Sequence, residues 1–220
     1  ALNRAARKGI LFAPASRIRR SAEQFLIPEG TERTFTTASV FTLQWHITQA
    51  CDLHCKHCYD RTERKAMALP QAFGVLNRFY DFCRRRNVAG QVSFTGGNPL
   101  LHPDFNKLYG AASDLGLSLA ILGNPVQRNR LKPILAIEPP VFYQVSLEGL
   151  PEHNDDIRGP GHFDRTMTFL GLLRESGVYS MVMLTLTRDN MDQVLPLAER
   201  LQGECDLFTF NRLSMVGEGA

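Results

Sequence analysis

The chain has 220 residues, of which 44% are hydrophobic and 21% charged, a composition that can bury a core and that excludes a disordered, fibrous or disulfide-stapled protein. Its 25 Lys and Arg residues against 22 Asp and Glu leave a net charge of +3, too small to predict a nucleic-acid partner. No apolar run reaches the roughly 20 residues that cross a bilayer, and the first residues lack a signal-peptide pattern, so we expect a cytoplasmic protein without membrane contact.

The first 38 residues fit no repeating unit, apart from a short strand predicted at 33–37. We interpret residues 1–38 as an N-terminal extension that carries a solvated basic tail. The basic residues of this tail are Arg4, Arg7, Lys8, Arg17, Arg19 and Arg20. The chain begins with Ala1 rather than Met, and we expect it to be a fragment of a longer protein.

From residue 41 onward, short β-rich runs alternate with stretches of helical period, which is typical of βα units around a parallel sheet. Strands are expected at residues 41–47, 91–95, 117–122, 141–147, 179–187 and 206–213. With five helices between them, they predict an α/β fold: a partial (β/α)6 TIM-like barrel in residues 39–220, truncated after the sixth strand. We expect the site at the C-terminal strand ends, in the loops that begin near residues 48, 96, 123, 148 and 188.

Three of the five cysteines follow the first predicted strand with the spacing C-x3-C-x2-C, at Cys51, Cys55 and Cys58. Thiolates are the ligands that iron–sulfur clusters prefer, and three of them in one loop can bind three irons of a 4Fe–4S cluster. The fourth iron then has no protein ligand. An open coordination position of this kind is what a reactive metal site requires.

Two other interpretations of this loop remain: a zinc site that adds His54 or His57, and three buried reduced cysteines. Zinc sites usually pair two short ligand units at a distance, and the sequence has no second unit. We expect both histidines to surround the cluster rather than to ligate it. Cys83 and Cys205 fall on a predicted helix face and at a strand start, where we expect structural roles.

The cysteine loop resembles the signature of radical S-adenosylmethionine (SAM) enzymes. The resemblance implies that the open iron binds the amino and carboxylate groups of SAM. It further implies that one-electron reduction cleaves SAM to methionine and a 5′-deoxyadenosyl radical, which abstracts hydrogen from a substrate. The catalytic residues are then Cys51, Cys55 and Cys58, and Tyr59 occupies the aromatic position that in the family lies near the adenine.

After the second strand, Gly96-Gly97-Asn98-Pro99 resembles the GGEP motif of the family, which contacts the SAM amino group. Paired glycines let a ligand approach the backbone, although a lone Gly-Gly would more simply be a strand-to-helix turn. Asn98 replaces the usual glutamate, and an amide carries no charge to pair with the ammonium. Its carbonyl can still accept a hydrogen bond.

Later strand ends carry further matches. Asn124 stands where the family has Thr-Asn-Gly, a partial match. The stretch from Val145 to Asp164 resembles the SLDG…H…RG…GxFD pattern of peptide- and protein-modifying members, which implies that Ser146 and Arg158 bind the SAM carboxylate. Without these flanking matches, we would interpret Arg158 as a cation in a surface loop. Leu186 could pack beneath the adenine, or serve equally well as a core residue.

The resemblance also implies a substrate class. The pattern around the fourth strand belongs to members that carry a C-terminal auxiliary-cluster domain of the SPASM or twitch type and modify peptides or proteins. The Gly-Gly-Asn-Pro variant is similar to maturases assigned to thiazole- or selenazole-type modification. We expect flavodoxin or ferredoxin as reductant. The alternatives are a cofactor-biosynthesis or sulfatase-maturing relative, or, in another class, a non-catalytic iron–sulfur electron carrier or zinc module.

Overall fold

The computed structural model describes residues 40–62, 67–214 and 216–219. The predicted extension at residues 1–38, its basic residues and the predicted strand at 33–37 lie outside the described residues.

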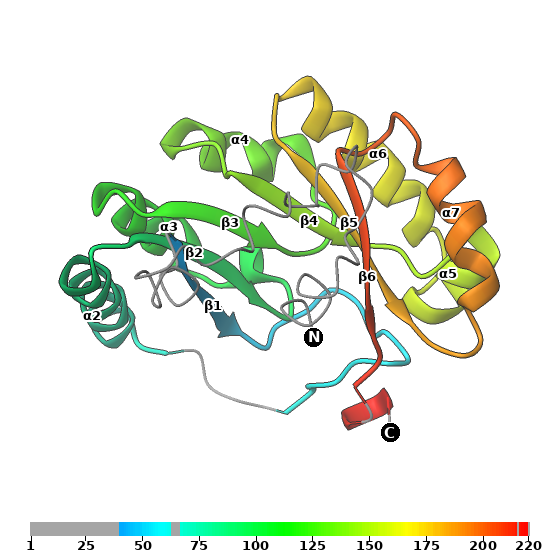
Figure 1. Cartoon of the computed structure of the whole chain (residues 1–220), viewed down its shortest axis with the longest axis horizontal. Helices are drawn as coiled ribbons and strands as arrows, with labels where there is room; N and C mark the ends of the chain where they lie inside the picture. Colours follow the sequence, from blue (N-terminus) through cyan, green and yellow to red (C-terminus); the bar gives the residue numbers. More distant parts are fainter. Residues whose placement is uncertain (1–39, 63–66, 215, 220) are drawn as a thin grey trace, which may run out of the picture. The chain divides into compact units, whose positions relative to one another are not determined.

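The described chain folds around one six-stranded sheet (Figure 1). Its strands are β1 (Val40–Thr48), β2 (Ala89–Gly96), β3 (Ser118–Leu122), β4 (Phe142–Ser146), β5 (Ser180–Leu186) and β6 (Leu207–Arg212). Their order in the sheet equals their order in the chain, and the pairs from β2/β3 to β5/β6 are all parallel. All six strands lie within two residues of their predicted bounds. The predicted open, barrel-like α/β fold is therefore confirmed.

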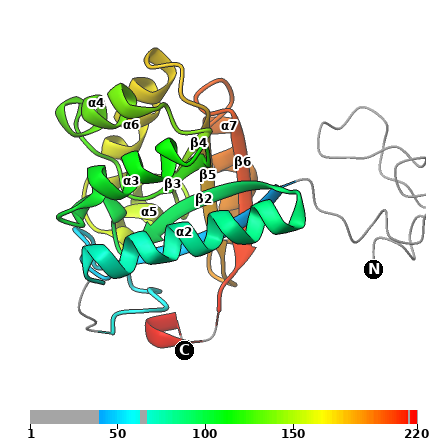
Figure 2. The ribbon, with the colours of Figure 1, turned by 90° about the vertical axis from the view of Figure 1, so that its left-hand side faces the viewer.

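Helices cover one face of this sheet (Figure 2). They are α2 (Leu69–Arg86), α3 (Phe105–Asp114), α4 (Arg128–Ile137), α5 (Pro151–Arg158), α6 (His162–Glu175) and α7 (Val194–Arg200), with 3-10 turns η2 (Pro99–Leu101), η3 (Met191–Gln193) and η4 (Gly217–Gly219). None of the described helices is long and apolar enough to span a bilayer.

The prediction of five helices was wrong, because the β4–β5 connection contains two, α5 and α6. Gly159-Pro160-Gly161 separates them, and both glycines have positive φ, at 101° and 71°. Such backbone is rarely adopted by other residues, so a single continuous helix is excluded at this point. The short helix α5 carries Arg158 in its last turn, next to the cysteines.

Strand alternation divides apolar from polar side chains. Val92 and Phe94 of β2, like Tyr143 and Val145 of β4, are buried in the hydrophobic core. Their neighbours in sequence point to the other face of the sheet, since successive residues of a strand face opposite ways. On that face Thr95, Gln144, Ser146 and Thr185 line a cavity. The sheet therefore has one face for packing and one polar face for a ligand.

Candidate functional site

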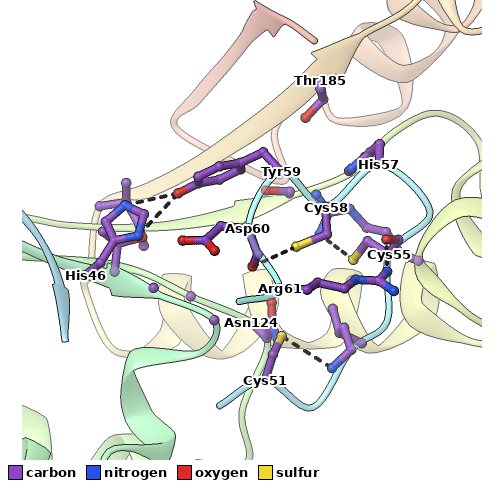
Figure 3. A pocket seen from close by; sticks show the side chains of 18 of the residues that line it. His46, Cys51, Cys55, His57, Cys58, Tyr59, Asp60, Arg61, Asn124 and Thr185 are labelled. Carbon is purple, nitrogen blue, oxygen red and sulfur yellow. Dashed lines mark hydrogen bonds between the residues drawn. The ribbon is translucent and has the colours of Figure 1, made fainter. Parts of the chain in front are cut away.

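The cavity has a volume of about 540 Å³ and lies at the C-terminal ends of the strands. It is lined by the ends of all six strands and by the segment of residues 49–61. The first part of this segment, residues 49–59, contains the three closely spaced cysteines and is named the cysteine loop. Figure 3 shows their side chains together on one side of the cavity, with His46 on the other.

The cysteine loop is tied to its surroundings through backbone hydrogen bonds at three places. Asn98 N donates to Ala50 O over 2.7 Å, so the end of β2 holds the beginning of the loop. Lys56 N donates to Ile157 O of α5 over 3.0 Å, and Glu218 N of η4 donates to Cys58 O over 2.9 Å. The positions of the cysteines are therefore set by three separate elements of the fold.

Two of the three sulfurs accept hydrogen bonds from nitrogen donors. Asn124 Nδ2 lies 3.5 Å from Cys51 Sγ, and Arg158 Nη1 lies 3.7 Å from Cys55 Sγ. Burial raises the pKa of the Cys55 thiol, and the charge of Arg158 opposes this rise. Donors at these positions stabilise a thiolate over a thiol, which is the form that binds metals.

Gly96 and Gly97 pack directly against the backbone that leads into the cysteine loop. A Cβ at residue 96 would lie 2.1 Å from Thr48 O, and one at residue 97 would lie 2.3 Å from Ala50 O. Neither distance is possible for a side chain. The paired glycines are thus required for the close contact between β2 and the backbone at the cysteine loop. The sequence did not reveal this reason for two adjacent glycines. Both glycines also line the cavity.

Asn98 is 1% exposed, and both polar atoms of its side chain have a hydrogen-bond partner within the protein. Its Oδ1 accepts from Leu100 N over 3.2 Å, capping η2, and its Nδ2 donates to Asp52 Oδ1 over 3.0 Å. Neither Asn98 nor Pro99 lines the cavity. The structure therefore places both residues behind the cavity wall rather than on it.

Asp52 lies within the cysteine loop and was not singled out from the sequence. Its Oδ1 also accepts from Asn124 Nδ2 over 2.6 Å. The backbone carbonyl of Asn124 accepts from the buried Tyr143 hydroxyl over 2.9 Å, which fixes the position of the asparagine. Asn124 lines the cavity, and its Nδ2 links Cys51 to Asp52 because it donates to both side chains. No sequence motif signals this contact, because the two residues are 72 positions apart.

Glu148 is a second residue that sequence reasoning missed, beyond its place in the motif after β4. It is fully buried, and its Oε1 accepts from Arg158 Nε over 2.8 Å, while His57 Nε2 lies 3.1 Å from the same oxygen. Its Oε2 accepts from Thr185 N over 2.8 Å. Burial alone would raise the pKa of Glu148, but the charge of Arg158 and the contact with His57 outweigh it and lower the pKa to about 2. Arg158 is thereby held against the cysteine loop.

The remaining predicted residues divide between the cavity and the core. Ser146 and Tyr59 line the cavity, whereas Leu186 packs against the hydrophobic core and does not line it. The Tyr59 hydroxyl lies 3.0 Å from His46 Nε2 (Figure 3). His46 lines the cavity and was also missed. The available signal was its place in β1 between Trp45 and Ile47, which are both buried on the other face.

The sequence profile of the Radical SAM superfamily matches residues 45–201, which include the end of β1, the cysteine loop and strands β2 to β5. The chain belongs to this superfamily. Its members bind a 4Fe–4S cluster and SAM, as the resemblance of the cysteine loop implied.

Two radical SAM proteins that are similar to this chain carry names for different activities. The chain is 29% identical over 177 residues to the AdoMet-dependent heme synthase of Nitratidesulfovibrio vulgaris, which covers 72% of this chain and 45% of that protein. It is 28% identical over 185 residues to the mycofactocin maturase MftC of Mycolicibacterium smegmatis, covering 81% of this chain and 46% of that protein. The chain thus spans about half the length of the curated relatives it matches.

Solved structures share the radical SAM fold. Streptococcus suis SuiB bound to S-adenosylmethionine has a TM-score of 0.65 at 23% identity, over 80% of this chain and 41% of SuiB. SuiB bound to the precursor peptide SuiA has a TM-score of 0.66 at 19% identity, over 97% of this chain and 51% of SuiB. At this identity the likeness shows the fold alone.

The donors present fit the cluster of a radical SAM protein. Among the described residues, no group of three or more His, Cys, Asp or Glu side chains is placed to hold a single metal ion. In a 4Fe–4S cluster each thiolate binds a different iron, so three thiols spread around one end of a cavity suit it. The amide and guanidinium donors at Cys51 and Cys55 also match the hydrogen bonds that tune such clusters.

Proposed function

We propose that the chain is the catalytic core of a radical SAM enzyme that cleaves SAM reductively and uses the 5′-deoxyadenosyl radical to abstract hydrogen from a substrate. The observation that carries this proposal is the placement of Cys51, Cys55 and Cys58 around one cavity, in a chain that belongs to the superfamily. A bound 4Fe–4S cluster supplies the electron and an open iron for SAM. The protein supplies the position and the electrostatic surroundings of both groups.

Within this function, each cavity residue has a proposed role. The three cysteine thiolates hold the cluster, and Tyr59 lies along the adenine. Ser146 and Arg158 face the SAM carboxylate, where a guanidinium is an apt partner. The proposed SAM contacts also include Gly96, Gly97, Asn98, Pro99, Asn124 and Leu186. Of this last group, Gly96, Gly97 and Asn124 line the cavity and have direct access to a ligand.

A peptide or protein is the substrate that the cavity supports best. Its wall carries neutral groups that donate and accept hydrogen bonds, namely Gln44, Gln144, Thr185 and Asn211. Such groups can pair with the amides of a peptide backbone. The mycofactocin maturase and the SuiB complex with SuiA supply precedents among similar proteins. A tetrapyrrole is the second candidate, favoured by the likeness to the AdoMet-dependent heme synthase.

Two further parts of the proposal concern the electron donor and the cellular location. A flavodoxin or ferredoxin would deliver the electron. A cytoplasmic location suits the site, because all five cysteines are free thiols and a reducing compartment keeps them available for the cluster.

The test is anaerobic iron–sulfur reconstitution of the full-length protein, followed by reduction with SAM and detection of 5′-deoxyadenosine. Cys55→Ala removes one proposed ligand, and Cys205→Ala is the matched control, a free cysteine outside the cysteine loop. We expect deoxyadenosine from wild type and Cys205→Ala and none from Cys55→Ala. Equal product from Cys55→Ala, or no SAM cleavage by a fully loaded wild type, would contradict the proposal.

The substrate proposal needs a separate experiment. The reduced enzyme is incubated with SAM and either a candidate precursor peptide or an iron-containing tetrapyrrole, in deuterated and ordinary form. Deuterium transfer into 5′-deoxyadenosine from the peptide supports the proposed class. Transfer only from the tetrapyrrole would replace it with the second candidate.

A further inference from the structure

The cavity wall carries one large aromatic side chain that does not belong to the hydrophobic core. Tyr59 directly follows the third cysteine and is 51% exposed. Of the Phe, Tyr and Trp residues in the described part of the chain, Tyr59 alone lines the cavity. Adenine is the flat aromatic part of SAM, and nucleobases bind proteins by stacking on such rings. Within the proposed function, the Tyr59 ring is therefore the surface on which adenine stacks.

A stacking ring binds its ligand best when its orientation is fixed before the ligand arrives, because ordering a side chain costs entropy. The backbone of Tyr59 is fixed by η4. A Cβ at Gly217 would lie 2.4 Å from Tyr59 O, and Glu218 N donates to Cys58 O over 2.9 Å. These contacts hold the main chain only. The ring still turns about its side-chain torsions, so a separate contact has to fix its orientation.

His46 provides this contact from the opposite side of the cavity. Figure 3 shows the Tyr59 ring directed from the cysteine loop toward His46. The hydroxyl lies 3.0 Å from His46 Nε2 and 3.3 Å from Nδ1. A neutral imidazole has one nitrogen with a free lone pair, so in either tautomer a nitrogen near the hydroxyl can accept its proton. The rings are inclined at 71° with their centroids 6.0 Å apart, and His46 therefore leaves the faces of the Tyr59 ring uncovered.

The direction of the His46 side chain is set by its strand. His46 lies in β1 between Trp45 and Ile47, which are both buried in the hydrophobic core. Successive residues of a strand face opposite ways, so burial of these two neighbours turns His46 toward the cavity. A shift of register by one residue would expose both apolar side chains, which keeps the imidazole in place. The contact thus joins a residue of the cysteine loop to a fixed point on the sheet.

We propose that His46 is a positioning residue for SAM: it anchors the Tyr59 hydroxyl and so holds the ring in the orientation that stacks on adenine. The inference rests on the proposed function, because it assumes that SAM binds in this cavity. His46 acts through Tyr59 and does not itself contact SAM. Its contribution to SAM affinity must therefore disappear when the Tyr59 hydroxyl is removed.

A double-mutant cycle tests this dependence. SAM affinity is measured by anaerobic equilibrium dialysis, without substrate, on reconstituted wild type, His46→Ala, Tyr59→Phe and the double variant, each corrected for its iron content. We expect each single substitution to weaken SAM binding about 2- to 10-fold, the worth of one hydrogen bond. The double variant should bind no more weakly than the weaker single variant, because both substitutions remove the same contact.

Two further variants separate the hydrogen bond from the fold of β1. His46→Gln places an amide near the position of Nε2, and we expect it to recover SAM affinity to within about twofold of wild type. Thr42→Ala is the matched control. Thr42 is exposed on the same face of β1 but does not line the cavity, so its substitution should leave SAM affinity unchanged.

The outcomes separate the inference from the proposed function. If His46→Ala binds SAM as wild type does, or if the double variant loses the product of the two single effects, His46 does not act through Tyr59. A His46→Gln variant as weak as His46→Ala, or an equal loss in Thr42→Ala, would also overturn the inference. All four results leave SAM binding by wild type intact. A fully loaded wild type that does not bind SAM would instead overturn the proposed function.

Discussion

On the β2–β3 side of the cysteine loop, two amides surround one exposed carboxylate, whereas on the β4–β5 side a fully buried carboxylate pairs with a guanidinium that is 10% exposed. The first cluster, Asp52 with Asn98 and Asn124, contacts Cys51; the second, Glu148 with Arg158 and His57, contacts Cys55. Solvent screens the charge of Asp52, so this cluster can exchange its contacts for a ligand at low cost. Separating Glu148 from Arg158 is costly by comparison, because each buried charge would lose its partner.

The largest expected effect comes from breaking the buried pair. Glu148→Gln removes the charge that compensates Arg158 and keeps the side-chain volume, so it should lower the free energy of unfolding by about 3–5 kcal/mol. Asn124→Ala, on the other side of the cysteine loop, should cost only about 1–2 kcal/mol, because solvent screens the exposed Asp52 carboxylate to which Asn124 donates. Urea unfolding of the apo-protein measures both. If the two variants lose equal unfolding free energy, the buried charge pair stabilises the fold no more than the exposed Asp52 cluster does.

The second prediction uses pH to sharpen the same comparison. His162 is buried beside the Glu148 cluster, through Asn154, whose Nδ2 lies 3.2 Å from His162 Nδ1 and whose Oδ1 accepts from Glu148 N. Burial, aided by the charge of Arg158, lowers the pKa of His162 from 6.5 to about 4. The unfolded state therefore binds the proton first, and the stabilisation present above pH 6.5 is lost as the pH falls toward 4.

The expected loss between pH 7 and pH 5 is about 2 kcal/mol, measured by urea unfolding of the apo-protein. His102, whose pKa burial also lowers, contributes in the same direction. Glu148 loses its contribution only at lower pH, between its unfolded pKa of 4.5 and its folded pKa of about 2. His162→Gln should flatten the profile above pH 5. A variant with the slope of wild type would assign the effect to other groups.

The strands could be predicted from the sequence because their alternation and spacing are local signals, and all six fall within two residues of the predicted bounds. Helix α5 could not, since only Asn154 of its residues is buried and it has no apolar stripe to detect. The cysteines were recognisable from spacing alone. The partners of Asp52 and Glu148 were not, because these contacts join residues 46, 72 and 37 positions apart and depend on how the strand ends are placed beside one another.

The last prediction concerns the glycines that seat the cysteine loop on the Asp52 side. Gly97→Ala places a Cβ about 2.3 Å from Ala50 O, and a backbone atom cannot move aside as a flexible side chain can. We expect a loss of about 1–3 kcal/mol in unfolding free energy, as overpacking produces, together with lower iron content after reconstitution, because residues 50–52 must shift.

Gly171→Ala is the matched control for this substitution. Gly171 lies within α6, where an added Cβ would meet no atom within 4 Å, so alanine should stabilise the helix by about 0.5–1 kcal/mol and leave iron binding unchanged. If Gly97→Ala keeps full iron content, the cysteine loop tolerates displacement at its β2 contact. The position of Cys51 would then depend on Asn124 more than on the backbone, and the Asp52 cluster, rather than the paired glycines, would be what aligns this side of the site.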